Sequence, residues 1–431
     1  MTPPPILDHS TEIVATALFA LAILHTFLTK YFHNLAHRFE KDSIGEGVCH
    51  LLGEIEIVFG FWGGVFVTYL AVVVGSENAI HYLESLNFRE AAFVFVIMSI
   101  AATRPILVAA EKIISWISLN FLWKPENPVR NITYFITIFT FGPLLGSFVT
   151  EPAAMTVVAI LLKSQFFDAK VSKRFMYSCI AVLFVNISIG GTLTNYAAPP
   201  ILMVANVWHW DNAFMMTHFG YKTIIAVFLN TFLLTAINYR ELIKLKRPSI
   251  RQAQKMPLGI KAIYLLFLIL VVATAHHMTI FAGIFLFFLG VTAITKKYQD
   301  ELQLRSSLLV AFFLAGLVVL GNLQAWWLKP IIASLSDMNL FFSATALTAV
   351  TDNAALTYLG SLVPEMSDSM HYALVAGAVA GGGLTIIANA PNPAGYSILR
   401  DSFGEDGIDP IQLLLYALIP TVVAMLCFWN L

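Results

Sequence analysis

Charged residues are scarce in this sequence. Only 12% of the residues are charged, 58% are hydrophobic, and the mean hydropathy is +0.76, a profile that excludes an ordinary soluble domain. Apolar runs of about 17–25 residues, the length that crosses a bilayer as a helix, recur along the whole chain. These runs lack the polar–apolar alternation of a membrane barrel. The composition therefore predicts an all-α polytopic membrane protein.

Cysteine, excess charge and enzyme motifs are also lacking. The three cysteines (Cys49, Cys179 and Cys427) are far apart, which excludes a disulfide framework or a cysteine metal site. The formal net charge of −1 gives no sign of a nucleic-acid partner. No H-E-x-x-H or G-x-S-x-G motif occurs. We therefore expect no enzyme activity and no cofactor beyond the ions that a transporter would carry.

Two acidic motifs stand within otherwise apolar sequence. They read Thr150-Glu151-Pro152-Ala153-Ala154 and Thr351-Asp352-Asn353-Ala354-Ala355. Each is followed by a glycine-rich break, GGTLT at 190–194 and GGGLT at 381–385. A carboxylate inside a membrane is costly and is functional by default. Two acids at matching places in two chain halves predict one ion site built from an internal repeat.

The distribution of charge predicts the orientation of both motifs. Residues 240–261 carry seven basic side chains against one acid, so this loop is predicted to be cytoplasmic and to link two repeats. The sequence on both sides of Glu151 is basic, whereas Asp352 is flanked mainly by acids. We therefore expect two re-entrant hairpins that enter from opposite faces, as in an inverted-topology repeat. The residues used are Lys124, Arg130, Lys163, Lys170, Lys173 and Arg174 around Glu151, and Lys329, Asp337, Glu365 and Asp368 around Asp352.

The paired breaks predict interrupted helices. Residues 190–200 read GGTLTNYAAPP and residues 381–393 read GGGLTIIANAPNP, which combine glycine, proline and polar residues within a spanning segment. The predicted organisation is as follows: N-terminal scaffold helices at 1–112; a first repeat at 113–239, with a re-entrant hairpin near 132–166 and a broken helix near 176–206; a basic linker at 240–261; and a second repeat at 262–431, with a hairpin near 339–363 and a broken helix near 371–399.

The breaks and hairpin tips together offer oxygen ligands for a hard cation. Protons and metal cations compete for a buried carboxylate, which is a sufficient physical basis for exchange. The alternatives left open are acids satisfied by neighbouring helices and asparagines that cap half-helices. The predicted cation- and proton-binding residues are Thr150, Glu151, Thr194, Asn195, Thr351, Asp352, Asn353, Asn389 and Asn392, with Glu151, Asp352 and Asn353 as the sodium ligands.

A further set of charges lies in the first apolar segments. Glu54 and Glu56 fall in one apolar run and Arg104 in a later one. Two residues apart on a helix, the glutamates face different sides. The favoured interpretation is a structural ion pair between one glutamate and Arg104, because buried opposite charges normally find each other. The alternative is that one glutamate relays protons.

At these motifs the chain resembles the ion transporter superfamily of arsenite permeases, dicarboxylate–sodium symporters and sodium/proton antiporters. It is most similar to a bacterial sodium/proton antiporter family. The resemblance implies a transport domain that moves in an elevator-like manner against a dimeric scaffold. It also implies tips at 150–151 and 351–353, and broken-helix loops at 194–200 and 389–393. The dicarboxylate members have Ser-Asn-Thr tips without an acid, whereas both tips here carry one, which would repel an anion.

These observations lead to one functional expectation. The chain is expected to be a multi-pass secondary transporter of the bacterial inner membrane that exchanges sodium or lithium for protons. Its partners would be monovalent cations, protons and membrane lipid, with a homodimer implied by the resemblance alone. The alternative is an anion or metalloid carrier, for arsenite or dicarboxylates, on the same fold.

Overall fold

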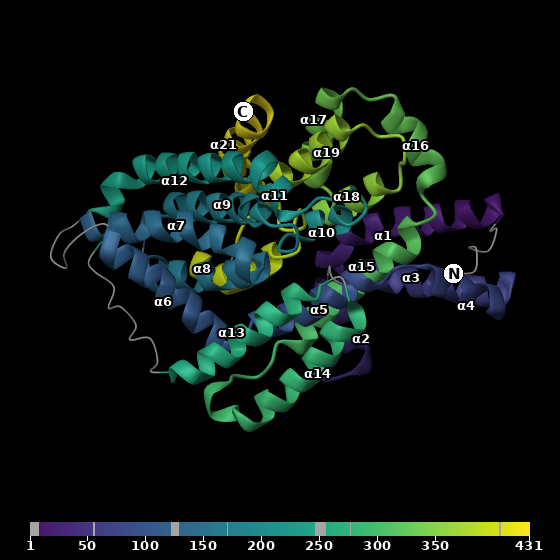
Figure 1. Cartoon of the computed structure of the whole chain (residues 1–431), viewed down its shortest axis with the longest axis horizontal. Coiled ribbons are helices and arrows are strands. Elements are labelled where there is room, and N and C mark those ends of the chain that lie inside the picture. Colours follow the sequence, from purple (N-terminus) through teal and green to yellow (C-terminus); the bar gives the residue numbers. More distant parts are fainter. Residues whose placement is uncertain are drawn as a thin grey trace. The chain divides into compact units, whose positions relative to one another are not determined.

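The computed structural model describes residues 8–54, 57–121, 129–169, 171–245, 256–275, 277–404 and 407–431. Every regular element in these ranges is a helix, which confirms the all-helical prediction for this part of the chain (Figure 1). Six of the described helical segments are long and apolar enough to cross a membrane. They are His9–Thr26, Asn131–Val149, Lys173–Leu193, Asn212–Leu242, Leu304–Gly321 and Pro410–Asn430.

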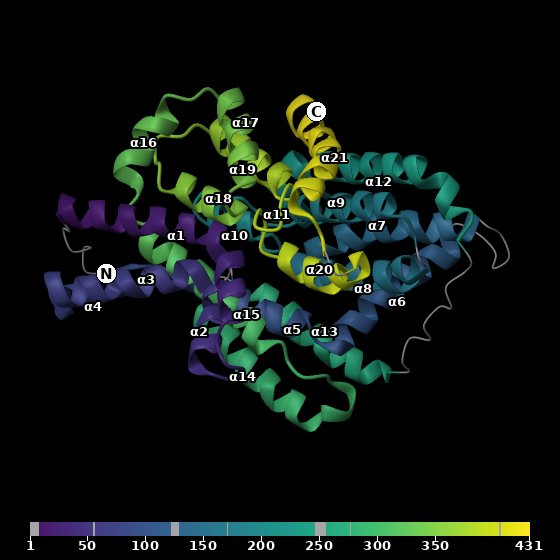
Figure 2. The ribbon, with the colours of Figure 1, turned by 180° about the vertical axis from the view of Figure 1, so that it is seen from behind.

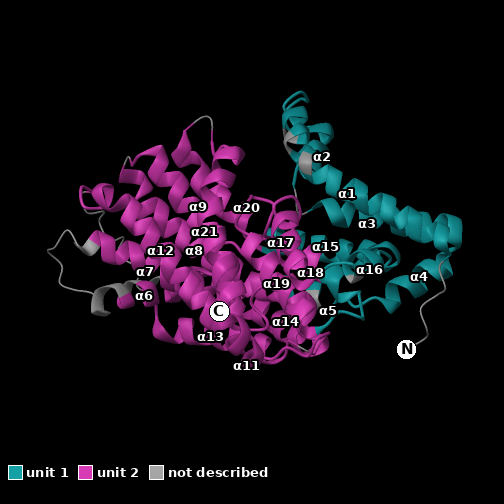
Figure 3. Cartoon of the chain, turned by 90° about the horizontal axis from the view of Figure 1, so that it is seen from above, with its two compact units in different colours: residues 1–95, 304–335, 358–367 teal, residues 96–303, 336–357, 368–431 magenta. Residues whose placement is uncertain are grey.

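The chain divides into two compact units that alternate along the sequence (Figure 3). Unit 1 comprises residues 1–95, 304–335 and 358–367, and unit 2 comprises residues 96–303, 336–357 and 368–431. The predicted division into 1–112, 113–239 and 262–431 stays a prediction. Within the predicted linker 240–261, residues 246–255 lie outside the described residues.

Unit 1 is held together by a close helix crossing. A Cβ on Gly316 would collide with the backbone of Phe59 and Gly60, and a Cβ on Gly63 would lie 3.2 Å from the Cα of Gly316. Small residues let membrane helices approach this closely. The helices wholly within unit 1 are α1 (His9–Ala36), α2 (Ile44–Leu52), α3 (Val58–Tyr69) with a π-helical turn at Leu70–Val74, α4 (Ser76–Ser85), α15 (Leu304–Gly321) and α16 (Ala325–Ala333); α5 (Arg89–Ala101) and α18 (Asn353–Ser361) each have residues in both units.

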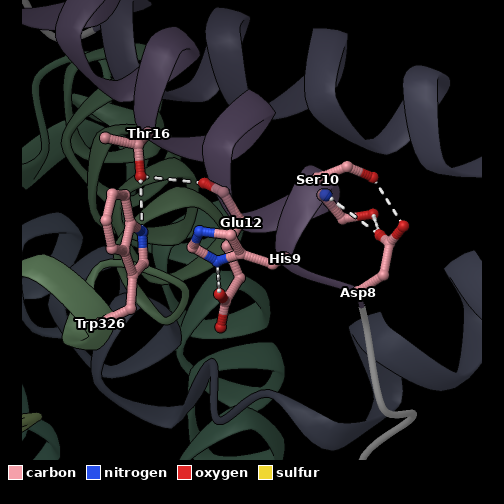
Figure 4. A network of polar contacts seen from close by, with 7 residues as sticks. Asp8, His9, Ser10, Glu12, Thr16 and Trp326 are labelled. Atoms are coloured by element: carbon pink, nitrogen blue, oxygen red, sulfur yellow. Dashed lines mark hydrogen bonds and ion pairs between the residues drawn. The ribbon is translucent and has the colours of Figure 1, made fainter.

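The first helix begins at a capped end (Figure 4). The carboxylate of Asp8 accepts hydrogen bonds from the Ser10 hydroxyl at 2.6 Å and from the backbone N–H of Thr11 at 3.1 Å. These bonds hold the pKa of Asp8 below its ordinary value, and the bond from Ser10 has the largest effect. Further along α1, Thr16 accepts a hydrogen bond from the indole of Trp326 at 3.1 Å. This bond fixes α16 against α1 within unit 1.

Unit 2 is built around α9, which is buried on all faces because its sequence is apolar around its full circumference. Helices α7, α12 and α21 pack against it, and α7, α9 and α12 lie side by side in both views (Figure 1, Figure 2). The helices wholly within unit 2 are α6 (Arg104–Phe121), α7 (Val129–Val149), α8 (Glu151–Gln165), α9 (Lys173–Gly190), α10 (Pro199–Ala205), α11 (Asn212–Met215), α12 (Tyr221–Leu242), α13 (Leu258–Ala273), α14 (Met278–Ile294), α17 (Asp337–Thr348), α19 (Asp368–Gly381), α20 (Asn392–Leu399) and α21 (Pro410–Asn430).

The glycine crossing of unit 1 can be tested by adding one methyl group. Gly316→Ala should lower the thermal midpoint (Tm), because backbone atoms of α3 cannot move aside as a side chain can. The free energy of unfolding should fall by about 1–3 kcal/mol. Gly290→Ala is the matched control, since a Cβ there meets no atom within 4 Å. Thermal unfolding in detergent checks both variants, and equal Tm values for the two would contradict the close crossing.

Candidate functional site

The first candidate tip is the turn between α7 and α8. Thr150 links the two helices with a φ of +79°, a region that favours glycine and costs other residues about 1–3 kcal/mol. Glu151, the first residue of α8, is fully buried, with 0% of its surface exposed. Backbone strain beside a buried acid is typical of functional sites.

The second candidate tip lies between α17 and α18. The Oδ1 atom of Asp352 accepts hydrogen bonds from the backbone N–H groups of Ala354 at 2.8 Å and Ala355 at 3.3 Å. Asp352 therefore caps the N-terminus of α18, where the helix dipole favours negative charge. The backbone N–H of Asn353 donates to the carbonyl of Ala388 at 3.0 Å. This bond ties the second tip to the irregular segment that follows α19.

The first helix break, between α9 and α10, is satisfied by a serine of α7. The hydroxyl of Ser147 donates to the carbonyl of Gly190 at 2.6 Å and accepts from the N–H of Leu193 at 2.9 Å. The hydroxyl of Thr194 donates in turn to the carbonyl of Ser147 at 2.7 Å. The backbone groups that the break exposes thus find partners on the helix that leads to the first tip.

The second break, between α19 and α20, is arranged in a similar way. The amide of Asn392 donates to the carbonyls of Gly382 and Thr385, each at 2.8 Å. The hydroxyl of Thr385 donates to the carbonyl of Ala349, at the end of α17, at 3.0 Å. Thr385 and Thr194 therefore make corresponding bonds, each to the helix that precedes the neighbouring tip.

One hydrogen bond joins the first tip to the second break. The Nδ2 atom of Asn389 donates to Oε2 of Glu151 at 2.9 Å, although the two residues are 238 positions apart. Oxygens without a partner are costly when buried, and carboxylate, hydroxyl and amide oxygens are what a hard cation binds. Among the described residues, five buried side-chain oxygens of the tips and the second break lack a hydrogen-bond partner: Thr150 Oγ1, Glu151 Oε1, Asn353 Oδ1, Asn389 Oδ1 and Asn392 Oδ1.

The site also contains two carboxyl groups. Glu151 and Asp352 are both buried, and both belong to unit 2. Within the described ranges, no group of three His, Cys, Asp or Glu residues could hold a metal ion. Two carboxylates surrounded by neutral oxygens suit an alkali-metal cation better than a transition metal, which prefers imidazole or thiolate ligands.

Glycines let the broken helices approach the acids and amides. A Cβ on Gly191 would collide with the carboxylate of Glu151. A Cβ on Gly382 would collide with the hydroxyl of Ser188 and would lie 2.8 Å from Nδ2 of Asn353. The glycine-rich breaks therefore make room for site residues as well as interrupting the helices.

Two of the sequence-predicted residues have other neighbours. The amide of Asn195 donates to the carbonyl of Trp210 and its backbone N–H donates to Oδ1 of Asn212, both at 3.0 Å. The backbone N–H of Thr351 donates to the carbonyl of Leu347 at 3.0 Å, at the end of α17. The structure therefore brings together Glu151, Asn389 and their neighbours, and holds Asn195 against the segment that leads into α11. The ligand roles of all these residues stay predictions.

The charges singled out in the first apolar segments have partners within their own units. In unit 1, Oε1 of Glu54 pairs with Arg305 at 2.6 Å. In unit 2, Arg104 pairs with Oδ1 of Asp300 at 3.1 Å. Glu56 lies outside the described residues, so the pairing of a glutamate with Arg104 stays a prediction.

Ser147 and Ser188 are site residues that the sequence analysis did not select. The hydroxyl of Ser188 donates to the carbonyl of Val379 at 2.7 Å, which joins α9 to α19. A hydroxyl in a helix that is buried on all faces needs an acceptor, and that requirement is the signal that could have identified it.

Comparison with known protein families decides the class. Residues 10–431 match the model of a family described as "Putative Na+/H+ antiporter". The chain belongs to this family. No curated protein matches the chain. The antiporter is therefore a multi-pass membrane transporter and not an enzyme, and its family exchanges monovalent cations for protons.

The strained tip of the antiporter gives a test in which stability and affinity change in opposite directions. Thr150→Gly should raise the Tm, because glycine adopts a φ of +79° without strain. The same change should raise the KM for the cation, because it removes a buried hydroxyl oxygen. Thr150→Ser keeps both the hydroxyl and the strain, and should match the wild type in Tm and KM. Thermal unfolding and cation-dependent proton flux measure the two quantities, and a lower Tm for Thr150→Gly would contradict the strain.

Proposed function

We propose that this antiporter exchanges sodium or lithium for protons across the bacterial inner membrane, with Glu151, Asp352 and Asn353 as sodium ligands. The observation that carries the proposal is the set of five unpartnered buried oxygens at the tips and the second break, one of which belongs to the carboxylate of Glu151. Such oxygens can replace the hydration shell of a small cation. No cofactor is needed, since the transported ions supply the charges that move.

In the proposed cycle, the ionised carboxylates hold the cation on one side of the membrane and release it when protons arrive. Protonation removes the negative charge that binds the cation, so the two substrates compete for one site. The hydrogen bond between Asn389 and Glu151 supports this competition, because the amide orients one carboxylate oxygen and leaves the other free. The neutral, protonated site then returns across the membrane.

The proposed architecture has two inverted-topology repeats, each with a re-entrant hairpin and a broken helix, that move in an elevator-like manner. The corresponding bonds of Thr194 and Thr385 support equivalent roles for the two halves. The scaffold would be the N-terminal helices at 1–112, the basic loop 240–261 would face the cytoplasm, and the protein would act as a homodimer in lipid. Asn195 would serve this site through the first broken-helix loop.

An anion or metalloid carrier on the same fold is less well supported. Among the described residues of the candidate site, the unpartnered atoms are four oxygens that only accept, the hydroxyl of Thr150, and one donor nitrogen, Nδ2 of Asn353. An anion needs donors, and the carboxylates of Glu151 and Asp352 would repel it. The atoms present therefore favour a cation.

Proton flux in sealed proteoliposomes tests the proposal. Glu151→Gln and Asp352→Asn should each abolish proton flux driven by sodium or lithium, because each removes a charge that binds the cation. The protein should remain folded, since an amide has nearly the same shape as a carboxyl. Asp168→Asn changes an exposed acid of unit 2 and serves as the matched control.

The choice of ion decides between the candidate substrates. Flux should follow sodium and lithium gradients but not potassium, and counterflow with arsenite or dicarboxylates should be absent. Unchanged sodium-driven flux in Asp352→Asn would refute the role of Asp352 as a cation ligand. Counterflow with an anion would instead favour the alternative carrier.

A further inference from the structure

Pro143 lies within α7 shortly before the first tip. Proline has no backbone N–H, so the carbonyl of the residue four positions earlier, Phe139, loses its helical partner. Phe139 is fully buried, with 0% of its surface exposed. A buried carbonyl needs another donor, because no water is available at that depth.

Two neighbouring helices supply donors to this carbonyl. The Nδ2 atom of Asn186 in α9 donates to the carbonyl of Phe139 at 3.0 Å. The hydroxyl of Thr231 in α12 shares its one hydrogen between the carbonyl of Phe139 at 3.0 Å and the carbonyl of Val227, in its own helix, at 2.7 Å. Both side chains are buried, with exposures of 0% and 1%. The single carbonyl that proline leaves unpaired therefore binds α7 to two other helices at once.

The orientation of the Asn186 amide is fixed by another asparagine. The Nδ2 atom of Asn230 donates to Oδ1 of Asn186 at 3.0 Å, which leaves Nδ2 of Asn186 to face Phe139. Asn230 also donates to the carbonyl of Pro420 in α21 at 3.2 Å. The network thus joins α7, α9, α12 and α21, all of which belong to unit 2.

The part of α7 around Pro143 leads directly to the site. A Cβ on Gly190 would lie 2.6 Å from the carbonyl oxygen of Pro143, so this part of the helix lies close against the first break. One turn later, Ser147 donates to the carbonyl of Gly190. The strained turn at Thr150 and the acid Glu151 then follow. The position of Glu151 therefore depends on what holds this part of α7 in place.

We propose that Asn186 and Thr231 are positioning residues that hold α7 in place through the Phe139 carbonyl, which Pro143 leaves without a helical partner, and thereby place Glu151 against Asn389. This inference rests on the proposed role of Glu151 in cation binding. It assigns Asn186 and Thr231 no contact with the cation. Their effect is to fix the hairpin that carries the acid.

Asn186→Leu removes both the donor and the amide network. It should lower the Tm and raise the KM for sodium roughly tenfold, because a small displacement of a binding group weakens a site built for a defined geometry. Thr231→Val removes only one hydroxyl and should change both quantities in the same direction by less. This milder variant keeps the proposal testable if Asn186→Leu does not fold.

Pro143→Ala supplies the missing N–H and gives a test that does not depend on transport. In the double variant Asn186→Leu/Pro143→Ala, the Phe139 carbonyl regains a helical partner, so the Tm should recover above that of Asn186→Leu alone. The KM for sodium should stay high, because Asn186 no longer ties α7 to α9 through this carbonyl. If the Tm change of the double variant equalled the sum of the changes in Asn186→Leu and in Pro143→Ala, the proposal would be overturned.

Asn238→Leu is the matched control. The amide of Asn238 in α12 donates to Ser178 in α9 at 3.0 Å and to the carbonyl of Leu234, so it joins the same two helices without α7. Its loss should lower the Tm and leave the KM for sodium unchanged. An equal rise in KM would show that general packing of α9 and α12, and not the bonds to the Phe139 carbonyl, places the acid, and would overturn the proposal.

The two proposals fail in different ways. Undiminished exchange by Glu151→Gln would refute the role of Glu151, while non-additive Tm changes would still show that Asn186 serves the carbonyl freed by Pro143. Loss of exchange in Glu151→Gln with additive Tm changes would refute the positioning role alone.

Discussion

A carboxylate enclosed in protein must be compensated by nearby donors, and the hydrogen bond from Asn389 to Glu151 meets that constraint in unit 2. It can form only if the tip after α7 reaches the segment after α19. The glycines remove the side chains that would prevent this approach, and the bonds of Ser147 and Thr194 hold the first break against α7. Much of the unit's local geometry can be understood as what allows this one contact.

The two acids are compensated differently, and the difference has a physical origin. Asp352 precedes α18 and accepts two backbone N–H groups, so the helix itself stabilises its charge. Glu151 is already the first residue of α8, and its carboxylate accepts a hydrogen bond from the side chain of Asn389. The acid that depends on a distant amide is the one whose position requires support from the rest of the unit.

The helical class and the positions of the helix breaks could be predicted because both depend on local sequence. Glycine and proline remove side chains or donors at fixed places, so the ends of α9 near Gly190 and of α19 near Gly381 lie where these residues cluster. The partner of Glu54 could not be predicted, since Arg305 is 251 positions away and nothing local marks it. The same holds for the strained φ of Thr150, which neighbouring helices impose on a residue that does not favour it.

Gly191 lies against Glu151 with no room for one added carbon. Every missense change in a glycine codon introduces a residue that has a Cβ, so no single amino-acid replacement at this position preserves the fit. Natural variation among antiporters of this type should therefore be strongly restricted at the position, even though its side chain is a single hydrogen atom. Selection must therefore keep a residue without a Cβ next to this carboxylate.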